Sequence, residues 1–597
     1  MCGIVGLYWD QPNPSINLDI MFSQMLKKLY HRGPDNQKYW LAEHQQGGLG
    51  FNRLSIIDLS QNAMQPLWTV NKDVAITFNG ECYNFQELKQ TLNKHTSINW
   101  QSKGDAEVVL YYYYYFGIDK SLRDINGFFS LAIWDKRTIK PTIILARDRM
   151  GKKPLFYSYQ NKTLLWASEI KALMCYPNFD DTPCPESESL FFMFEHIPAP
   201  YTQFKHTQKL KPGHYLQFHD NNYTIHKYWD LSFQRSKVTK KDSLIDDYHS
   251  LVHDAVKLRC QSDVPMHLFL SGGFDSTLIA HTIKQYVPSI KALVAQFPES
   301  KYDESDQATL VAKKLDIPIT KIPVSAISKE DVDHIIKYLD EPFSDPAVIP
   351  LFKLCQSAKQ NTTVVITGDG GDEQQAGYFY KFWGESNLQS KLPFSVRHWI
   401  IRFLMTKMKW LGPHYDFRKY LAPELDYINP QHTFHCFDFL SADQRDFAYE
   451  YINDLVNSYL KKTNNLFDFF SAYLFDYMRH CFNTKTDVST MLNSLESRSP
   501  LMDYRLFEWV SQVPHDMFYD SSKQQGKQLI RKLLTPIMGE DYINSPKRGF
   551  SVPLQSWAKT SFPELEDLKV SCPSGHFNYK MSLSLYINQQ IKKKYIK

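Results

Sequence analysis

The chain has 597 residues, 43% of them hydrophobic and 22% charged, with a formal net charge of +4. This length exceeds what a single hydrophobic core supports, so we expect several domains, and so small a charge speaks against nucleic acid as a partner. The nine cysteines are scattered without a CxxC pair, which argues against a disulfide framework and a zinc site. Because we find neither a leader peptide nor an apolar run of about 18 residues, we expect a cytoplasmic protein without stable membrane insertion.

The first residues, Met1-Cys2-Gly3, indicate an N-terminal nucleophile. Removal of Met1 leaves Cys2 with both a thiol and a free α-amine, whose ordinary pKa is about 7.7–8.0. An amine that titrates near neutrality can act as the general base for the thiol beside it. A cysteine at position 2 also occurs without a function, so the rest of the chain must decide between the two interpretations.

Residues 1–230 carry short β-like runs separated by turns rich in Gly, Asn and Asp. Amphipathic stretches at Asp19–Tyr30 and Asp105–Tyr115 interrupt the series. This pattern predicts strands in sheets with helices packed on the outside. The predicted strands are Ile4–Tyr8, Val74–Phe78, Phe128–Trp134, Thr142–Ala146, Leu155–Tyr159 and Thr163–Ala167.

Polar residues in the same region suit a nucleophile that attacks an amide. The Asn79 side chain and the Gly80 backbone N–H form a workable oxyanion hole, although Asn-Gly is also a common hairpin turn. Arg53 could clamp a carboxylate or make a surface ion pair. Asp105, at a predicted helix start, could hold an ammonium group or merely cap the helix.

These segments resemble the class II glutamine amidotransferase domain over residues 2–215. The resemblance implies an αββα sandwich of the N-terminal-nucleophile type, in which Cys2 attacks the glutamine amide and releases ammonia. It also implies that Arg53 binds the glutamine carboxylate, Glu81 and Asp105 the α-amine, and Asn79 and Gly80 the oxyanion. The motifs that carry it are Met1-Cys2-Gly3-Ile4, His31-Arg32-Gly33-Pro34-Asp35, Arg53-Leu54-Ser55-Ile56, Asn79-Gly80-Glu81, Gly104-Asp105-Ala106-Glu107, Arg147-Asp148-Arg149-Met150-Gly151 and Lys153-Pro154-Leu155.

A polar connector is expected over residues 216–242, and the pattern then alternates between helices and buried strands. Such alternation predicts a parallel, doubly wound sheet followed by a mostly helical part. Ligands bind such sheets at the carboxyl ends of the strands, here the loops after Leu270, Phe297 and Thr367. The predicted series is helix Leu244–Leu258, strand Met266–Leu270, strand Lys291–Phe297, helix Ser305–Leu315, strand Ile319–Val324, helix Asp331–Leu339 and strand Thr363–Thr367.

The loop Ser271-Gly272-Gly273-Phe274-Asp275-Ser276 joins a buried strand to a helix. Its backbone N–H groups and the hydroxyls of Ser271 and Ser276 suit a pyrophosphate, and Asp275 can ligate Mg²⁺. The alternative is an ordinary Gly-rich turn. No Walker A lysine is present, which disfavours transfer of a γ-phosphate.

Three carboxylates follow the last strand of the series, in Thr367-Gly368-Asp369-Gly370-Gly371-Asp372-Glu373. So much negative charge in one loop indicates a bound cation, and Asp372 could share Mg²⁺ with Asp275. Lys547, further along the chain, offers positive charge for a polyanionic transition state.

Residues 243–560 resemble the PP-loop ATP pyrophosphatase domain of asparagine synthetases, with a tail over residues 561–597. The resemblance implies adenylation of a carboxylate by ATP and Mg²⁺, followed by attack of ammonia from the first site. By the same resemblance, Asp369 takes part in acyl-adenylate formation, Glu373 is the base for ammonia, and Lys547 stabilises charge at the transferring phosphate. The residues implied to contact the nucleotide are Leu270, Ala295, Thr367 and Gly368.

The sequence specifies the carboxylate that is amidated less closely than it specifies the reaction. Asp369 stands where many asparagine synthetases have Glu, and Ser499-Pro500-Leu501-Met502-Asp503 differs from the more frequent Val-Pro-Phe-Leu-Asp. We expect aspartate as acceptor, with a uronic acid of a surface polysaccharide or a cell-envelope precursor as the alternative. A PP-loop enzyme acting on tRNA is a weaker hypothesis, because it leaves the glutaminase motifs unexplained. A non-enzymatic sensor of glutamine or nucleotide is also weaker, because it predicts a broken catalytic set, whereas the expected carboxylate and glycine positions are occupied.

Three further features leave alternatives open. The basic amphipathic stretch Val396–Leu411 fits a packed helix better than a membrane-surface helix. The run Lys592-Lys593-Lys594 is predicted to be a frayed polar tail. The sequence does not fix the oligomeric state, and a homodimer is compatible with it.

Overall fold

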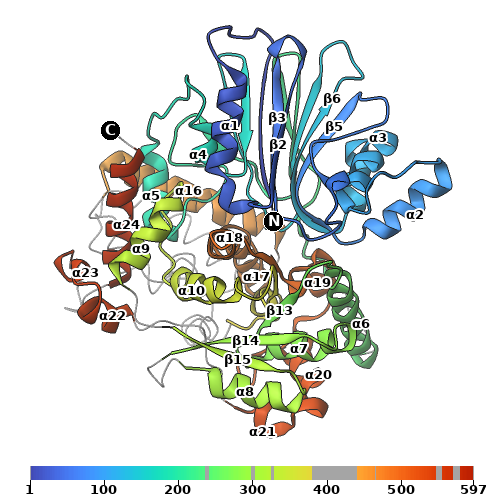
Figure 1. Cartoon of the computed structure of the whole chain (residues 1–597). Coiled ribbons are helices and arrows are strands. Elements are labelled where there is room, and N and C mark those ends of the chain that lie inside the picture. Colours follow the sequence, from blue (N-terminus) through green and yellow to red (C-terminus); the bar gives the residue numbers. More distant parts are fainter. Residues whose placement is uncertain are drawn as a thin grey trace.

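The computed structural model describes residues 2–235, 241–297, 303–324, 328–378, 440–463, 465–545, 554–568 and 579–595. Figure 1 shows two packed domains, an N-terminal one in blue and cyan and a C-terminal one in green to red. The predicted Lys547 and the stretch Val396–Leu411 lie outside the described residues. No helix of the described part is long and apolar enough to cross a lipid bilayer.

The N-terminal domain contains two six-stranded antiparallel sheets. The first has the order β10-β8-β9-β1-β3-β2 and the second β12-β11-β7-β6-β5-β4. Strands of the first sheet are β1 (Gly3–Trp9), β2 (Asn36–Leu41), β3 (Gly47–Arg53), β8 (Phe156–Gln160), β9 (Thr163–Ala167) and β10 (Thr207–Lys209). Strands of the second sheet are β4 (Leu67–Trp68), β5 (Val74–Cys82), β6 (Gly127–Asp135), β7 (Thr142–Arg147), β11 (His214–His219) and β12 (Asn222–Lys227).

The two sheets stack face to face, and helices cover their outer faces. Tyr8 of β1 meets Trp134 of β6 edge to face, with ring centroids 5.5 Å apart. Helix α1 (Leu18–Lys28) packs on the first sheet, and helices α2 (Phe85–His95) and α3 (Asp105–Asp124) pack on the second (Figure 1). The central strands are therefore buried on both faces, and the predicted αββα sandwich is confirmed.

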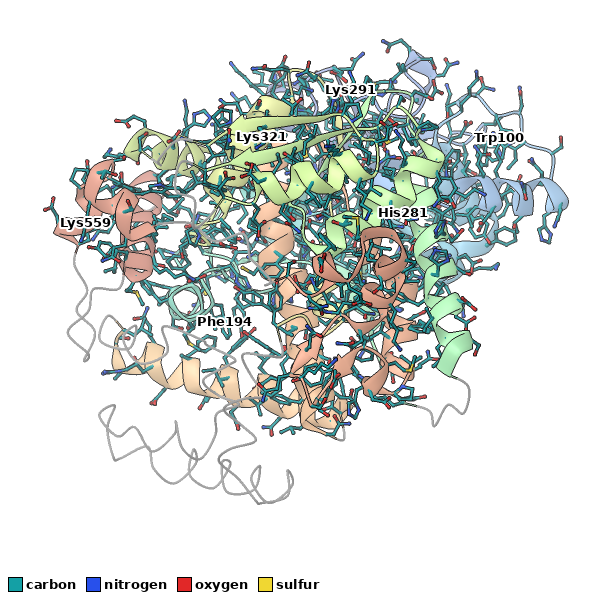
Figure 2. All side chains as sticks on the ribbon, turned by 90° about the horizontal axis from the view of Figure 1, so that it is seen from below. Trp100, Phe194, His281, Lys291, Lys321 and Lys559 are labelled. Carbon is teal, nitrogen blue, oxygen red and sulfur yellow. The ribbon has the colours of Figure 1, made fainter. Side chains whose placement is uncertain are left out.

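The C-terminal domain is built around a five-stranded parallel sheet of order β15-β14-β13-β16-β17. This confirms the predicted parallel, doubly wound sheet. Its edge strand β15 carries Lys321, which pairs with Asp306 at 2.8 Å, a charged edge of the kind that limits pairing with other chains. Figure 2 shows Lys321 on this sheet beside Lys291, and Trp100 on the N-terminal domain. The strands are β13 (Met266–Phe269), β14 (Lys291–Gln296), β15 (Ile319–Pro323), β16 (Val364–Ile366) and β17 (Glu496–Arg498).

Helices surround this sheet and form most of the other residues that the structure describes in this domain. Helix α9 begins with a capping box, in which Ser328 and Asp331 satisfy each other's backbone N–H groups. The helices beside the sheet are α6 (Lys241–Arg259), α7 (Phe274–Tyr286), α8 (Ser305–Lys314), α9 (Lys329–Tyr338), α10 (Val348–Ala358) and α11 (Gly371–Gln374). Later elements are α16 (Ala442–Lys462), α17 (Leu466–Tyr477), the π-helix η5 (Met478–Phe482), α18 (Asn483–Met491), α19 (Tyr504–Gln512), α20 (Gln528–Met538), α21 (Glu540–Ile543), α22 (Leu554–Thr560), α23 (Glu564–Asp567) and α24 (Tyr579–Tyr595).

The prediction of a frayed tail at the C-terminal lysines is wrong. They lie on the last turn of α24, whose apolar face is buried. Lys592 pairs with Glu188 at 2.5 Å, and the Lys594 ammonium donates to the backbone carbonyls of Lys337 and Leu339 at 2.6 and 2.9 Å. The sequence does not predict these contacts, because each partner of a lysine comes from a segment distant in the chain.

Candidate active sites and the domain interface

Cys2 immediately precedes the central strand β1 and lies where the two stacked sheets of the N-terminal domain meet. Its backbone nitrogen, which becomes the α-amine when Met1 is removed, donates to Asn79 Oδ1 at 3.0 Å. The thiol sulfur lies 3.9 Å from the Leu54 carbonyl oxygen. Burial raises the pKa of the Cys2 thiol, so the thiol is neutral at rest and needs a base to attack.

The predicted oxyanion-hole residues follow each other on β5, opposite the nucleophile. Asn79 is fully buried, and its amide Nδ2 donates to Ser130 Oγ at 3.2 Å, which orients the side chain. Gly80 has φ +145°, and a Cβ at this position would lie 2.0 Å from the Phe128 carbonyl oxygen. Only glycine fits there, so the strand passes close to its neighbour beside the nucleophile.

Arg53 ends β3 and is 5% exposed. Its guanidinium donates to the backbone carbonyls of Asp58 and of Ser60, the latter at 2.7 Å. These bonds hold the loop that places Leu54 against the thiol. The structure therefore puts Arg53 beside the nucleophile, and its part in binding a carboxylate stays a prediction.

Two buried carboxylates lie further along the same wall. Burial, followed by the negative charge of Glu496, raises the pKa of Glu81 well above its usual range. Burial also raises the pKa of Asp105 to about 6, while its Oδ2 accepts a hydrogen bond from the Cys82 N–H at 2.7 Å. Carboxylates in such a site bind a cation readily, because an ammonium group restores their ionised form.

The second candidate site lies at the carboxyl ends of β13 and β16. Gly272 has φ +78°, and its carbonyl accepts a hydrogen bond from the Tyr542 hydroxyl at 2.7 Å. Ser271 Oγ and Ser276 Oγ lie 3.1 Å apart across the turn. This turn leads directly into α7, so its N–H groups and the helix N-terminus face the same side. Of the other residues expected near a nucleotide, Leu270 and Ala295 are buried and Thr367 and Gly368 follow β16.

A lysine for which the sequence predicts no role occupies the predicted metal position. The Lys527 ammonium lies 2.5 Å from Asp275 Oδ2 and 2.8 Å from Asp372 Oδ1. Lys527 is 5% exposed, and these two carboxylates raise its pKa. Within the described residues no group of three His, Cys, Asp or Glu side chains could hold a metal ion. The two carboxylates nevertheless converge on one cation, which fits a Mg²⁺ ion that takes its other ligands from phosphates and water.

The remaining acidic residues of the loop have different surroundings. Glu373 is buried, and burial together with the charges of Asp372, Asp275 and Asp369 raises its pKa to about 8. Asp369 is partly exposed, and its Oδ2 accepts a hydrogen bond from Thr367 Oγ1 at 2.9 Å. The structure thus brings all three carboxylates to one strand end, and the raised pKa of Glu373 suits a base that titrates near neutrality.

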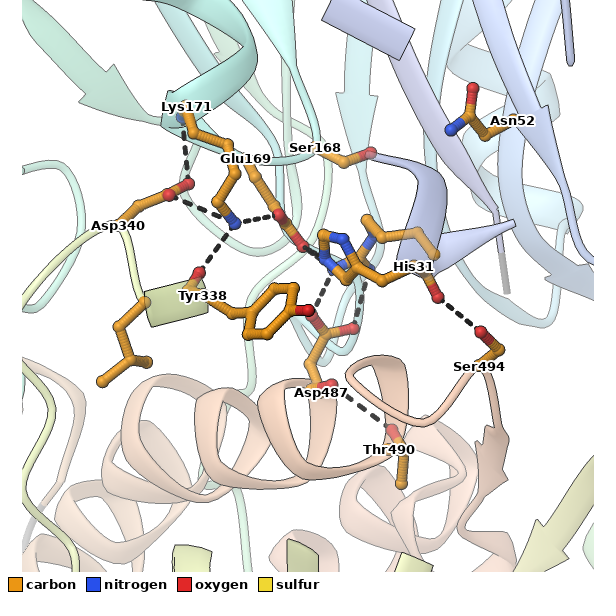
Figure 3. Close-up of polar contacts among 12 residues, drawn as sticks. His31, Asn52, Ser168, Glu169, Lys171, Tyr338, Asp340, Asp487, Thr490 and Ser494 are labelled. Carbon is orange, nitrogen blue, oxygen red and sulfur yellow. Dashed lines mark hydrogen bonds and ion pairs between the residues drawn. The ribbon is translucent and has the colours of Figure 1, made fainter. Parts of the chain in front are cut away.

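The two sites share a buried interface held by charged groups. Arg32 from the N-terminal domain makes a bidentate contact with Asp487 of α18, at 2.8 and 2.9 Å, and also donates to Glu169 at 2.7 Å. Lys171 reaches Asp340 at 3.2 Å (Figure 3). Since these side chains are largely withdrawn from water, each pair adds to the contact between the two domains.

A cavity of about 110 Å³ lies along this interface. Its walls come from both domains and combine apolar side chains with charged ones. Residues from the N-terminal domain include His31, Lys152 and Ser168, and those from the C-terminal domain include Asp340, Asp487 and Met491.

Comparison with known proteins agrees with both halves of this architecture. The family model described as a glutamine amidotransferase domain matches residues 1–229, and that described as asparagine synthase matches residues 247–581. Asparagine synthetase 1 (glutamine-hydrolysing) of Bacillus subtilis is 30% identical over 577 residues, covering 94% of this chain and 89% of that protein. A putative asparagine synthetase of Methanocaldococcus jannaschii is 33% identical over 423 residues, covering 66% and 79%.

Another relative, whose name differs, also matches over most of both chains. The protein named Amidase chry2 of Gibberella zeae is 27% identical over 583 residues, covering 89% of this chain and 85% of that protein. The two matched domains together span most of the chain, in the order that the sequence motifs predict. The chain therefore belongs to the glutamine-hydrolysing asparagine synthetase family, as a carbon–nitrogen ligase that uses glutamine and ATP.

Proposed function

We propose that this enzyme converts aspartate, glutamine and ATP into asparagine, glutamate, AMP and pyrophosphate. The observation that carries the proposal is the shared wall between the sites. Arg498 contacts Glu81 at 3.5 Å, and the next residue, Ser499, bonds to Thr367 Oγ1 at 2.8 Å. Two consecutive residues at the end of β17 thus contact the proposed amide-hydrolysis site and the proposed nucleotide site, which supports their coupling.

In the first half-reaction, the α-amine of Cys2 takes the thiol proton as the sulfur attacks the glutamine side-chain amide. The developing oxyanion is stabilised by Asn79 and Gly80, while Arg53 holds the glutamine carboxylate and Glu81 and Asp105 its α-ammonium group. The protonated α-amine then gives this proton to the amide nitrogen, the C–N bond breaks, and ammonia leaves a glutamyl thioester on Cys2. Water then cleaves the thioester to glutamate and restores the thiol.

Ammonia must reach the second site without meeting bulk water, because protonation would remove its nucleophilic lone pair. The interface cavity supports a protected route, since its walls come from both domains and include Ser168, whose hydroxyl lies 3.5 Å from the Asn79 amide. We infer that this cavity forms part of the passage.

In the second half-reaction, the Ser271–Ser276 turn binds the pyrophosphate portion of ATP, and Leu270, Ala295, Thr367 and Gly368 surround the nucleotide. Asp275 and Asp372 would hold Mg²⁺, which supplies positive charge to the phosphates when it is bound. Asp369 contributes to formation of the acyl-adenylate. Glu373 accepts a proton from the attacking ammonia, and Lys547 stabilises negative charge on the phosphate.

A panel of carboxylates tests the acceptor. The enzyme is incubated with ATP, Mg²⁺, ammonium chloride and either aspartate, glutamate or glucuronate, and AMP and the new amide are quantified. We expect AMP and asparagine in equal amounts with aspartate. Glucuronate is included as a second acceptor because one similar protein is named an amidase and not an asparagine synthetase. AMP formation with glucuronate alone would replace aspartate by a uronic acid, and no AMP with any carboxylate would refute the amide-ligase chemistry.

A further inference from the structure

A rigid loop of the glutaminase domain reaches the synthetase site. Buried Asp148 accepts hydrogen bonds from the backbone N–H groups of Met150, Lys152 and Lys153, at 2.9, 3.2 and 3.1 Å. The Arg147 guanidinium donates to the carbonyls of Gly151 and Lys153, at 2.9 and 2.8 Å. Because nearly every backbone group is bonded, the loop has one conformation.

The synthetase domain also forms hydrogen bonds with this loop. Asn483 Nδ2 donates to the Met150 carbonyl at 2.7 Å, and Arg479 donates to the Arg149 carbonyl at 3.4 Å. Asn483 begins α18, and Arg479 lies on the π-helix before it, a helix type that is enriched at functional sites. The loop is thus fixed relative to both domains.

The loop delivers the side chain of Lys152 to the end of β16. Lys152 is 2% exposed, and its ammonium donates to Ser499 Oγ at 3.1 Å. Asp369 Oδ2 lies 3.7 Å from the same nitrogen. Ser499 Oγ lies 3.4 Å from Asp369 and 2.8 Å from Thr367 Oγ1, so these four side chains form one network.

The two charged side chains of this network differ in their exposure to water. The Lys152 side chain is almost fully buried, whereas the Asp369 side chain is 42% exposed. Burial lowers the pKa of Lys152, and the Asp369 carboxylate is the first of the groups that oppose this effect. An ammonium group removed from water stays charged only beside an anion, so Lys152 holds the Asp369 carboxylate at the inner wall of the site.

We propose, on the basis of the function above, that Lys152 is a positioning residue of the acyl-adenylate site, supplied by the glutaminase domain. It fixes Asp369 and Ser499 in the arrangement that adenylation of the carboxylate substrate requires. The synthetase site is therefore incomplete without a side chain from the other domain. Docking of the two domains assembles the adenylation site as well as protecting ammonia.

The test compares Lys152→Met, a change that keeps an unbranched side chain one atom shorter and removes its charge, with Lys171→Met. Lys171 is the matched control. Like Lys152, it is a buried lysine of the glutaminase domain that pairs with an acid of the synthetase domain, in this case Asp340. AMP formation is measured with ammonium chloride as nitrogen donor and the acceptor found for the wild type, and glutamate release from glutamine reports the fold of the first domain.

We expect Lys152→Met to lower kcat for AMP formation at least 30-fold, with KM for ATP and glutamine hydrolysis within threefold of the wild type. Lys171→Met should stay within threefold in all three. In the Asp369→Asn background the additional Lys152→Met change should cost less than threefold, because its target is already lost.

Three results would overturn the proposal while leaving the amide-ligase function standing. The first is AMP formation by Lys152→Met within threefold of the wild type. The second is a loss of equal size in Lys171→Met, and the third is full additivity of Lys152→Met with Asp369→Asn; each of these two indicates a general structural role. A wild type that forms no AMP with any carboxylate refutes both the function and the inference, and is recognised before any variant is compared.

Discussion

The Arg498 guanidinium lies 3.5 Å from the carboxylate of Glu81, and both side chains are buried between the two domains. Arg498 also bonds to Glu496 at 2.6 Å and lowers the pKa of that carboxyl to about 2. One cation of the synthetase domain thus compensates a carboxylate expected to bind glutamine. Binding of the glutamine α-ammonium at Glu81 would add a second cation beside Arg498, which gives the two sites a direct electrostatic contact.

Replacement Arg498→Met should destabilise the protein by about 3–5 kcal/mol, because it leaves buried carboxylates without their cation. Denaturant unfolding followed by intrinsic fluorescence measures the change. Lys120→Met is the control, since Lys120 makes an exposed pair with Asp124 at 2.6 Å and its loss should cost less than about 1 kcal/mol. Equal stability of Arg498→Met and wild type would show that the buried pair carries no stabilisation.

The variant Cys2→Ala should lose glutamine hydrolysis by a factor of about 10³ or more, because no other group replaces the nucleophile. Synthesis with ammonium chloride should stay within threefold of the wild type, since the second site is untouched. Glutamate release and AMP formation are measured on the same preparation. Normal glutamine hydrolysis by Cys2→Ala would remove Cys2 from the mechanism.

The Lys527→Met variant should be less stable than the wild type in the absence of Mg²⁺, because Asp275 and Asp372 then repel each other. Added Mg²⁺ should raise the unfolding temperature of this variant more than that of the wild type, since no ammonium group competes for the carboxylates. Thermal unfolding at increasing Mg²⁺ concentrations, with Ca²⁺-free buffer and no nucleotide, provides the comparison. An identical Mg²⁺ response in both proteins would argue against a metal at this position.

Glu373 should make stability depend on pH in a defined direction. Its pKa rises from 4.5 to about 8 on folding, so between these values the folded protein binds a proton that the unfolded chain has lost. Its contribution is full below pH 4.5 and disappears as pH rises through 8. The stability of the wild type relative to Glu373→Gln should therefore fall between pH 5 and 8, as measured by unfolding in matched buffers. A difference that stays constant over this range would contradict the raised pKa.

The fold was predictable from the sequence because its periodic patterns are local. The strand Val74–Phe78 and the run before Ser271 carry enough apolar residues to identify themselves as buried strands. Strand β17 was missed as a strand, since Glu496–Arg498 has three polar residues. These residues are buried because Arg498 and Glu496 neutralise each other. Hydrophobic periodicity identifies only apolar strands, so it does not predict a strand stabilised by such an ion pair.

The site was predictable where chemistry resides in one short motif, as for Cys2 and for Asp275. It was not predictable where a cation arrives from elsewhere in the chain. Lys152 lies between two motif segments, and Lys527 immediately precedes a helix more than 250 residues after Asp275. The signal that could have found them is the excess of negative charge at the loop after β16, which requires cations that the loop itself lacks.

Isotope transfer tests the coupling of the two sites most directly. The enzyme is supplied with glutamine labelled with ¹⁵N at the side-chain amide, ATP, Mg²⁺ and the carboxylate acceptor, in the presence of excess unlabelled ammonium chloride at a pH where little free ammonia exists. A protected route between Cys2 and Glu373 predicts that the product amide retains most of the label. A product whose amide has the isotopic composition of the bulk ammonium would contradict the account.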